Sequence, residues 1–226
     1  MKTLKIDIIH DVVCSWCPIA YANLNQALGN LGMEADICFL PFELNPDMGP
    51  EGESIDAHLA RRYQWDKVRC QEYRKNLLLV ADQAGVCIDF AKRSHYYNTN
   101  KAHRLLHWSE GFNKQQPMNE LLIDAYFKQG LDISDPQVLL ALAEQVGLDR
   151  SKAEQALSSN IINQQLMMKK QRVAQLALSS VPAMIFNQST LITGSNSPEY
   201  FEQAIIALAN KSARSTHFNL TSLEET

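Results

Sequence analysis

The stretch that decides the fold is Cys14-Ser15-Trp16-Cys17-Pro18. It follows an alternating apolar run at residues 4–9, which predicts a β-strand, and it precedes residues 19–31, whose apolar positions recur at helical spacing. A C-x-x-C between a strand and a helix indicates a redox-active dithiol. Unpaired N–H groups at a helix N-terminus favour an anion, so a thiol there has a lowered pKa. We therefore expect Cys14 to be the exposed nucleophile and Cys17 to be a more buried resolving thiol.

The same spacing could supply half of a zinc site or a short structural disulfide. Zinc would need a second ligand pair, but Cys38, Cys70 and Cys87 are not spaced as pairs, and no histidine completes a C-x-x-H unit. We therefore expect no metal. Cys38 should be a small buried side chain. Cys70 and Cys87 should be inert buried thiols, although these two could pair under oxidation.

Composition narrows the class of protein. The chain has 226 residues, of which 46% are hydrophobic, and its net charge is −4. That charge argues against nucleic acid or an anionic membrane as the main partner. There is no apolar run long enough to span a membrane and no signal-peptide pattern at the start. Five scattered cysteines do not form the even framework of a secreted domain, so we expect a cytoplasmic protein.

The rest of the chain divides into three patterns. A second strand is predicted at residues 35–40, and the strand–helix–strand order implies parallel pairing. Later strands at residues 183–186 and 190–193 predict an antiparallel hairpin, and a last helix opens at Ser197-Pro198-Glu199. Between these segments the periodicity predicts only helices, at residues 55–63, 68–84, 99–109, 118–128, 135–146, 152–159 and 161–178.

This order predicts an α/β fold in which β-α-β and β-β-α pieces build one small sheet and enclose a large all-helical insertion. We expect the α/β domain to be discontinuous, with its first segment at residues 1–45 and its second segment at residues 179–210. The helical insertion should occupy residues 46–178, and a loose polar tail should follow at residues 211–226.

Together these features resemble the thioredoxin fold as used by DsbA-like oxidoreductases, most closely the FrnE-type branch, which is related to 2-hydroxychromene-2-carboxylate isomerases. The resemblance extends from residue 4 to about residue 208, and four stretches carry it: Asp11–Cys17, Phe42–Pro46, Asn98–Leu105 and Ser180–Ala183. It implies that Cys14 is the attacking thiolate, Cys17 the resolving thiol and Pro182 a cis-proline facing them. The Val181 backbone would then pair with an extended substrate.

The isomerases usually carry serine at the position of Cys14, so the cysteine here favours dithiol–disulfide exchange. Trp16 replaces the histidine that helps to stabilise the thiolate of DsbA, and Asp11 would oppose a thiolate. We therefore expect a less strongly oxidising couple than that of DsbA. Ser15 and Trp16 are predicted to contact substrate together with Val181.

His103 and His107 are four residues apart on one predicted helix, the spacing of a two-histidine metal pair. Arg104 would repel a metal at that place, so we interpret both histidines as structural. If the insertion covers the dithiol, however, His103 or Arg104 could line the cleft and contact substrate.

The predicted function is a thiol–disulfide oxidoreductase or protein disulfide isomerase. It should need no metal or organic cofactor, act on protein or peptide thiols and disulfides, and exchange electrons with glutathione or a thioredoxin system. Two alternatives stay open: a glutathione-dependent isomerase or transferase acting on a small aromatic molecule, and a redox-switched holdase or binding protein. Oligomeric state is left open.

Overall fold

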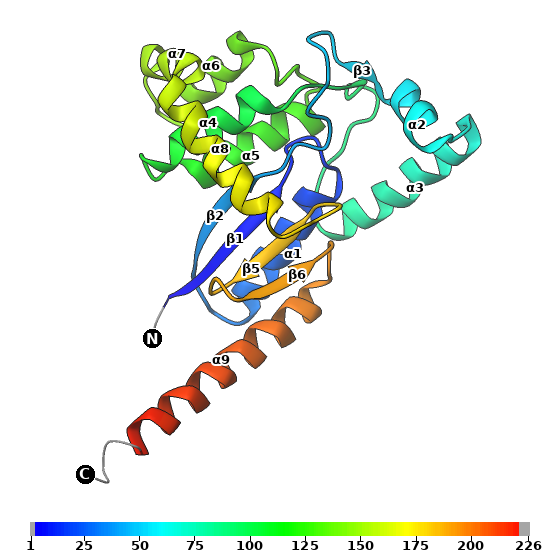
Figure 1. Cartoon of the computed structure of the whole chain (residues 1–226). Helices are drawn as coiled ribbons and strands as arrows, with labels where there is room; N and C mark the ends of the chain where they lie inside the picture. Colours follow the sequence, from blue (N-terminus) through cyan, green and yellow to red (C-terminus); the bar gives the residue numbers. More distant parts are fainter. Residues whose placement is uncertain (1–2, 222–226) are drawn as a thin grey trace.

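A central four-stranded mixed sheet organises the protein (Figure 1). The computed structural model describes the backbone of residues 3–221 and the side chains of residues 3–210. Its elements in chain order are β1 (Leu4–His10), α1 (Trp16–Asn30), β2 (Ala35–Pro41), β3 (Glu53–Ser54), α2 (Ile55–Tyr63), α3 (Lys67–Gln83), β4 (His95–Tyr96), α4 (Asn100–Glu110), α5 (Gln115–Phe127), α6 (Pro136–Gln145), α7 (Arg150–Ser158), α8 (Asn160–Ala174), β5 (Ala183–Phe186), β6 (Thr190–Thr193) and α9 (Pro198–Thr221).

The strands run in the order β2-β1-β5-β6. β1 is parallel to β2, with Ile6 opposite Ile37, and antiparallel to β5, with Ile6 opposite Phe186. β5 and β6 form the predicted hairpin. This is the thioredoxin arrangement that the sequence indicated, and each of these four strands lies within one residue of its predicted range.

Alternation along β1 and β2 sends side chains to two separate cores. Ile8 and Phe39 pack with α1 and with Phe201 of α9 on one face of the sheet. Ile9 and Leu40 point to the other face, where Val173 of α8 covers them. Because successive side chains of a strand alternate, neighbouring residues of one strand serve both cores.

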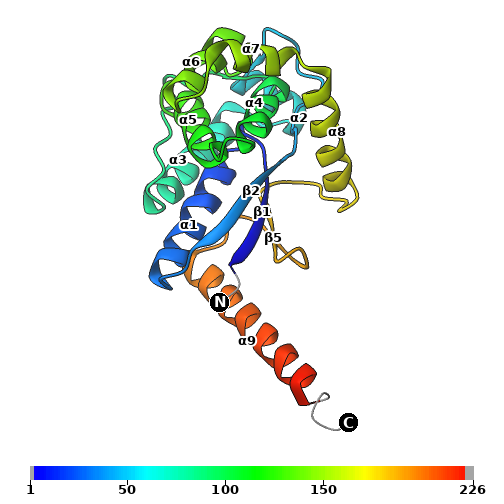
Figure 2. The same cartoon turned by 90° about the vertical axis from the view of Figure 1, so that its left-hand side faces the viewer.

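Helices α2–α8 lie between β2 and β5 in the sequence. Most of them gather beyond one end of the sheet, α8 runs back alongside β2, and α9 extends from the other end (Figures 1 and 2). Side-chain caps begin several of them: Asp66 accepts from the Arg69 N–H at the start of α3, and Ser159 does the same for Ile162 in α8. The predicted helical insertion is therefore confirmed.

Besides shifts of one to three residues at other helix ends, three larger features differ from the sequence prediction. β3 and β4 were missed because strands of two residues are too short to show alternation. α8 ends at Ala174 rather than at residue 178, and Ala177 has a left-handed φ of +50°.

The third difference is α9, which continues to Thr221 through residues 211–221, where we expected a loose tail. No glycine or proline interrupts the sequence between Glu199 and Thr221, so nothing local stops the helix. The end of the predicted tail, 222–226, lies outside the described residues. None of the described helices combines the length and apolar character that crossing a bilayer requires.

Candidate functional site

The two motif cysteines lie at the start of α1, as the sequence predicted. The Cys14 N–H donates to the Asp11 carbonyl at 3.0 Å, which closes a tight turn after β1. Ser15 occupies the N-cap position, and the Cys17 N–H donates to the Cys14 carbonyl at 3.2 Å. Both thiols are free. The helix begins at Trp16, three residues earlier than expected, and this places Cys17 in its first turn.

The predicted exposure of Cys14 is wrong. Its side chain is buried, with 7% of its surface accessible against 3% for Cys17. Both thiols belong to a small apolar cluster with Val173 and Val181, and Leu176 and Leu178 pack against it. The chain between α8 and β5 therefore comes close to the dithiol, a proximity that no local pattern encodes. Cys14 nevertheless remains the more accessible of the two.

The environment drives the two thiol pKa values apart. A hydrogen bond from the Cys17 thiol, helped by the N–H groups of Trp16 and Cys17, lowers the pKa of Cys14 in spite of burial and of nearby Asp11. Burial, together with donation to Cys14, raises the pKa of Cys17 well above its usual range. Because the thiolate is the reacting species, this favours Cys14 as the nucleophile.

Val181 and Pro182 lie beside Cys14. Their peptide bond is cis, as predicted, and the Cys14 sulfur lies 3.5 Å from the Val181 carbonyl oxygen. The Pro182 carbonyl is already paired, because it accepts from the Gly194 N–H at 2.9 Å. The structure thus brings Cys14 against Val181, although 167 positions separate the two in the sequence.

The remaining motif residues differ in accessibility. Ser15 is buried, and its side chain lies near the hydroxyl of Tyr73 on α3. Trp16 is partly exposed and packs against both cores. Of this pair, only Trp16 presents surface to a partner. Tyr73 was missed because nothing in its own segment links it to the motif.

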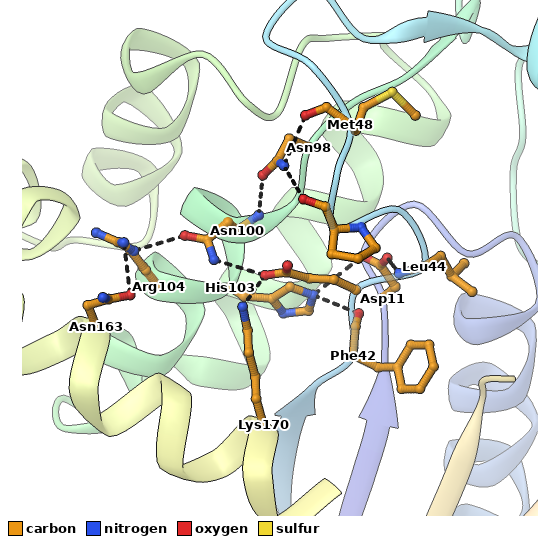
Figure 3. Close-up of polar contacts among 12 residues, drawn as sticks. Asp11, Phe42, Leu44, Met48, Asn98, Asn100, His103, Arg104, Asn163 and Lys170 are labelled. Carbon is orange, nitrogen blue, oxygen red and sulfur yellow. Dashed lines mark hydrogen bonds and ion pairs between the residues drawn. The ribbon is translucent and has the colours of Figure 1, made fainter. Parts of the chain in front are cut away.

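His103 lies beside Asp11 and the Phe42 carbonyl (Figure 3). It is buried, with 2% of its surface accessible, and its Nε2 lies 3.2 Å from the Phe42 carbonyl oxygen and 3.4 Å from Asp11 Oδ1. Asp11 Oδ2 accepts from the Leu44 N–H at 2.7 Å. These contacts join the loop after β2 to the turn that carries Cys14.

Arg104 points toward Asn163 and away from Asp11 (Figure 3). Its guanidinium donates to Asn100 Oδ1 at 3.0 Å, to the Leu157 carbonyl at 3.0 Å and to Asn163 Oδ1 at 2.8 Å. It therefore joins α4 to α7 and α8. The stretch Asn98–Leu105 holds the insertion together, and substrate binding by His103 and Arg104 stays a prediction.

Partly buried apolar side chains surround the dithiol cluster: Trp16, Phe42, Leu44, Leu176 and Leu178. Leu44 also borders a polar hollow of about 560 Å³ that Asp47, Glu53, Arg61 and Arg62 help to line. The side chains next to the thiols are thus apolar, and the hollow beyond Leu44 carries both acidic and basic side chains.

The three cysteines outside the motif differ from Cys14 and from one another in pKa or in burial. Burial raises the pKa of Cys38 to about 11. Cys70 is buried in the first turn of α3, as predicted. The predicted burial of Cys87 is wrong, because this residue follows the end of that helix and is exposed. A rise of 1.5 Å per residue separates such positions by roughly 20 Å. Cys70 and Cys87 therefore cannot form a disulfide, which needs Cα atoms within about 7 Å. Among the side chains of residues 3–210, no cluster of three metal-binding groups occurs.

Known proteins share this architecture. The chain is 27% identical to the uncharacterized protein YwbO of Bacillus subtilis (strain 168) over 204 residues, which is 90% of this chain and 96% of YwbO. A structure from Streptomyces coelicolor, SCO1869, described as a probable DsbA oxidoreductase, matches with a TM-score of 0.82 at 22% identity, covering 89% of this chain and 88% of that one. The cytosolic disulfide reductase DsbM of Pseudomonas aeruginosa, solved with GSH, matches with a TM-score of 0.63 at 17% identity, covering 93% and 99%.

At these identities the structural likenesses establish the fold. The family model of the DSBA-like thioredoxin domain matches residues 5–206, nearly the whole chain. Together with the thioredoxin sheet, the helical insertion and the dithiol at the start of α1, this match shows that the chain belongs to the DSBA-like thioredoxin domain family.

Proposed function

We propose that this protein is a thiol–disulfide oxidoreductase in which Cys14 attacks and Cys17 resolves. The observation that carries the proposal is the arrangement of the two thiols at the start of α1: Cys14 is the more accessible and lies 3.5 Å from the Val181 carbonyl oxygen, whereas Cys17 is buried in the first turn. In agreement with this arrangement, the pKa of Cys14 is lowered and that of Cys17 is raised. One thiol is thereby prepared to attack while the other stays protonated until the first step is complete.

The exchange balances in two steps. The Cys14 thiolate attacks a substrate disulfide, forming a mixed disulfide and releasing one substrate thiolate. Cys17 then loses its proton and attacks the Cys14 sulfur, forming the Cys14–Cys17 disulfide and releasing the second substrate thiolate. The substrate gains two electrons, and glutathione or a thioredoxin system returns two electrons to the protein. The reverse sequence oxidises a substrate dithiol.

Two observations support a peptide or protein substrate. The side chains around the cluster are apolar, which suits an extended chain with apolar side chains. The Val181 carbonyl lies against the Cys14 sulfur, so a substrate backbone passing the thiol could reach the segment that precedes β5. Glutathione as electron donor is supported by the fold shared with DsbM, a disulfide reductase solved with GSH.

The state of the cysteines also bears on the cellular compartment. All five cysteines are free, which suits a reducing compartment. DsbM, which has the same fold, is described as cytosolic. We infer that the protein works in the cytoplasm.

A trapping experiment tests the proposal. In Cys17→Ser the resolving step is lost, so mixed disulfides with glutathione or substrate proteins should accumulate at Cys14, and peptide mass spectrometry would locate them. Cys14→Ser should abolish both trapping and insulin reduction. Cys87→Ser, which removes an exposed thiol outside the motif, is the matched control and should behave like wild type.

Other outcomes would replace the proposal. Glutathione-dependent turnover of a small aromatic molecule that survives Cys17→Ser would point to an isomerase or transferase. Suppression of aggregation without insulin reduction would point to a redox-switched holdase. The reduction potential of the Cys14–Cys17 pair, measured against glutathione, would then set the direction of exchange.

A further inference from the structure

Arg93, in the loop between α3 and β4, is among the largest fully buried side chains of the protein, with 2% of its surface accessible. Aromatic rings enclose its guanidinium carbon: the centroids of Tyr126 and Phe127 lie at 4.8 Å, that of Tyr96 at 5.1 Å and that of Phe90 at 5.5 Å. Such rings attract a cation through their electron-rich faces.

No carboxylate pairs with Arg93 among the side chains of residues 3–210. Its Nη2 donates to the Val13 carbonyl at 3.3 Å, and its Nε has no hydrogen-bond partner there. Arginine stays protonated, and an uncompensated buried charge costs several kcal/mol. The rings and one carbonyl offset that cost without cancelling the charge, whereas an aspartate or glutamate would neutralise it.

The guanidinium of Arg93 lies close to the nucleophile. The Val13 carbonyl that it contacts belongs to the peptide that links Val13 to Cys14, so the charge is one peptide unit from the reactive residue. Backbone bonds fix the arginine loop: the Asp89 N–H donates to the Phe127 carbonyl at 2.8 Å, and the Arg93 N–H donates to the Asp89 carbonyl at 2.9 Å.

Tyr73 shows that the thiol and the guanidinium share one buried region. Burial raises the pKa of Tyr73 to about 12, and among the smaller contributions Arg93 lowers it while Cys14 raises it. Tyr73 therefore interacts electrostatically with both Arg93 and Cys14. The other titratable neighbours are Asp11 and Cys17 around Cys14, and Tyr96 and Tyr126 around Arg93.

We propose that Arg93 is a positioning residue of the dithiol: it holds the Val13 carbonyl and supplies a positive charge beside Cys14. No carboxylate forms an ion pair with this guanidinium among the described side chains, and the acidic group that faces the same region is Asp11, which acts on both Cys14 and Tyr126. The inference rests on the proposed function for its biological meaning. In this protein the charge takes the role that a cationic side chain inside the C-x-x-C would otherwise play, because Ser15 and Trp16 carry none.

The test compares neutral and charged replacements. Arg93→Met removes the charge and the donor, whereas Arg93→Lys keeps the charge. Iodoacetamide alkylation of reduced protein, followed against pH at the Cys14 peptide, gives the pKa of Cys14. We expect Arg93→Met to raise it by about one unit and to slow alkylation below that pKa about tenfold. Arg93→Lys should keep most of the wild-type value.

A second readout separates charge from packing. The oxidised form has no thiolate, so loss of the charge should destabilise the reduced form more than the oxidised form. The equilibrium constant with glutathione should shift toward the protein disulfide by the same factor as the alkylation rate. A merely structural arginine would lower the melting temperature of both forms equally. Arg150→Met, which removes a surface arginine paired with Glu144, is the control and should move neither readout.

The proposal fails if the pKa of Cys14 in Arg93→Met equals that of wild type, or if Arg93→Lys raises it as far as Arg93→Met does. If Arg93→Met does not fold, Arg93→Gln, which is neutral but keeps an N–H donor for the Val13 carbonyl, makes the same comparison. Because the readout is the pKa of one thiol, it stays valid even if Cys14→Ser shows that the protein is not an oxidoreductase.

Discussion

Asp11 Oδ1 and His103 Nε2 lie 3.4 Å apart in a place that solvent does not reach, with 0% and 1% of the two side chains exposed. Asp11 Oδ1 has no hydrogen-bond partner within the usual limits in residues 3–210, so the imidazole is its nearest potential donor. This pair joins the turn before Cys14 to α4 of the insertion, and it explains why an Ala-His-Arg-Leu stretch far from the motif belongs to the same site.

Replacing His103 by leucine would leave the Asp11 carboxyl buried beside an apolar group. We expect the free energy of unfolding to fall by about 2–4 kcal/mol, because the contact of the imidazole with the Phe42 carbonyl is lost and Asp11 Oδ1 loses the polar group beside it, although Oδ2 keeps the Leu44 N–H. Urea unfolding measures the loss. The double variant Asp11→Asn, His103→Leu should lose less than the sum of the two single variants. Strictly additive losses would show that the two side chains do not interact.

His10 predicts how stability depends on pH. Burial, and then neighbouring His103, lower the pKa of His10 well below its usual value. As pH falls below about 6.5, His10 becomes protonated in the unfolded state but stays neutral in the folded state. The free energy of unfolding therefore falls by up to about 1.4 kcal/mol per pH unit. His10→Phe, which suits the contact of this ring with Phe39 at 4.9 Å, should flatten that region of the profile. The assignment would be contradicted if the free energy of unfolding, measured with urea between about pH 7 and pH 5, depended on pH as steeply in His10→Phe as in wild type.

Cys38, Cys70 and Cys87 should be dispensable for redox turnover. Burial raises the pKa of Cys38 to about 11, which leaves almost no thiolate near neutral pH. Cys70 is buried, and Cys87 is too far from it to form a disulfide. Changing all three to alanine should keep insulin reduction within about twofold of wild type. A large loss in a variant that still folds would reveal a second redox pair.

Gly130 should be essential to the loop that holds Arg93. Its φ is +69°, and a Cβ there would lie 2.3 Å from the Lys92 carbonyl oxygen. Gly130→Ala adds backbone strain to a clash with backbone, so we expect a loss of at least about 2 kcal/mol in urea unfolding. Gly85→Ala is the matched control, because Gly85 has a φ of +70° with no atom within 4 Å of its added Cβ, and it should lose less. Equal losses would mean that the contact with Lys92 does not matter.

The sequence by itself determined the elements and their order. The alternation of residues 4–9, the helical spacing after Cys17 and the Asp135-Pro136 start are local signals, because they depend on side-chain period and on caps within a few residues. They predicted the strand pairing, the helical insertion and the position of the dithiol. The prediction of a loose tail at residues 211–221 was wrong, because a polar segment that lacks glycine and proline does not end a helix.

Only the tertiary structure decided how accessible and how charged the site is. The cover over Cys14 comes from Leu176 and Leu178, the support of Asp11 from His103, and the cation beside Val13 from Arg93, each brought in from a distant segment of the chain. Burial and electrostatic interaction depend on what fills the surrounding space, and that is set by how the insertion packs against the sheet. A short motif therefore predicts which side chains can react. Long-range packing sets the pKa values of those side chains and their accessibility to a substrate.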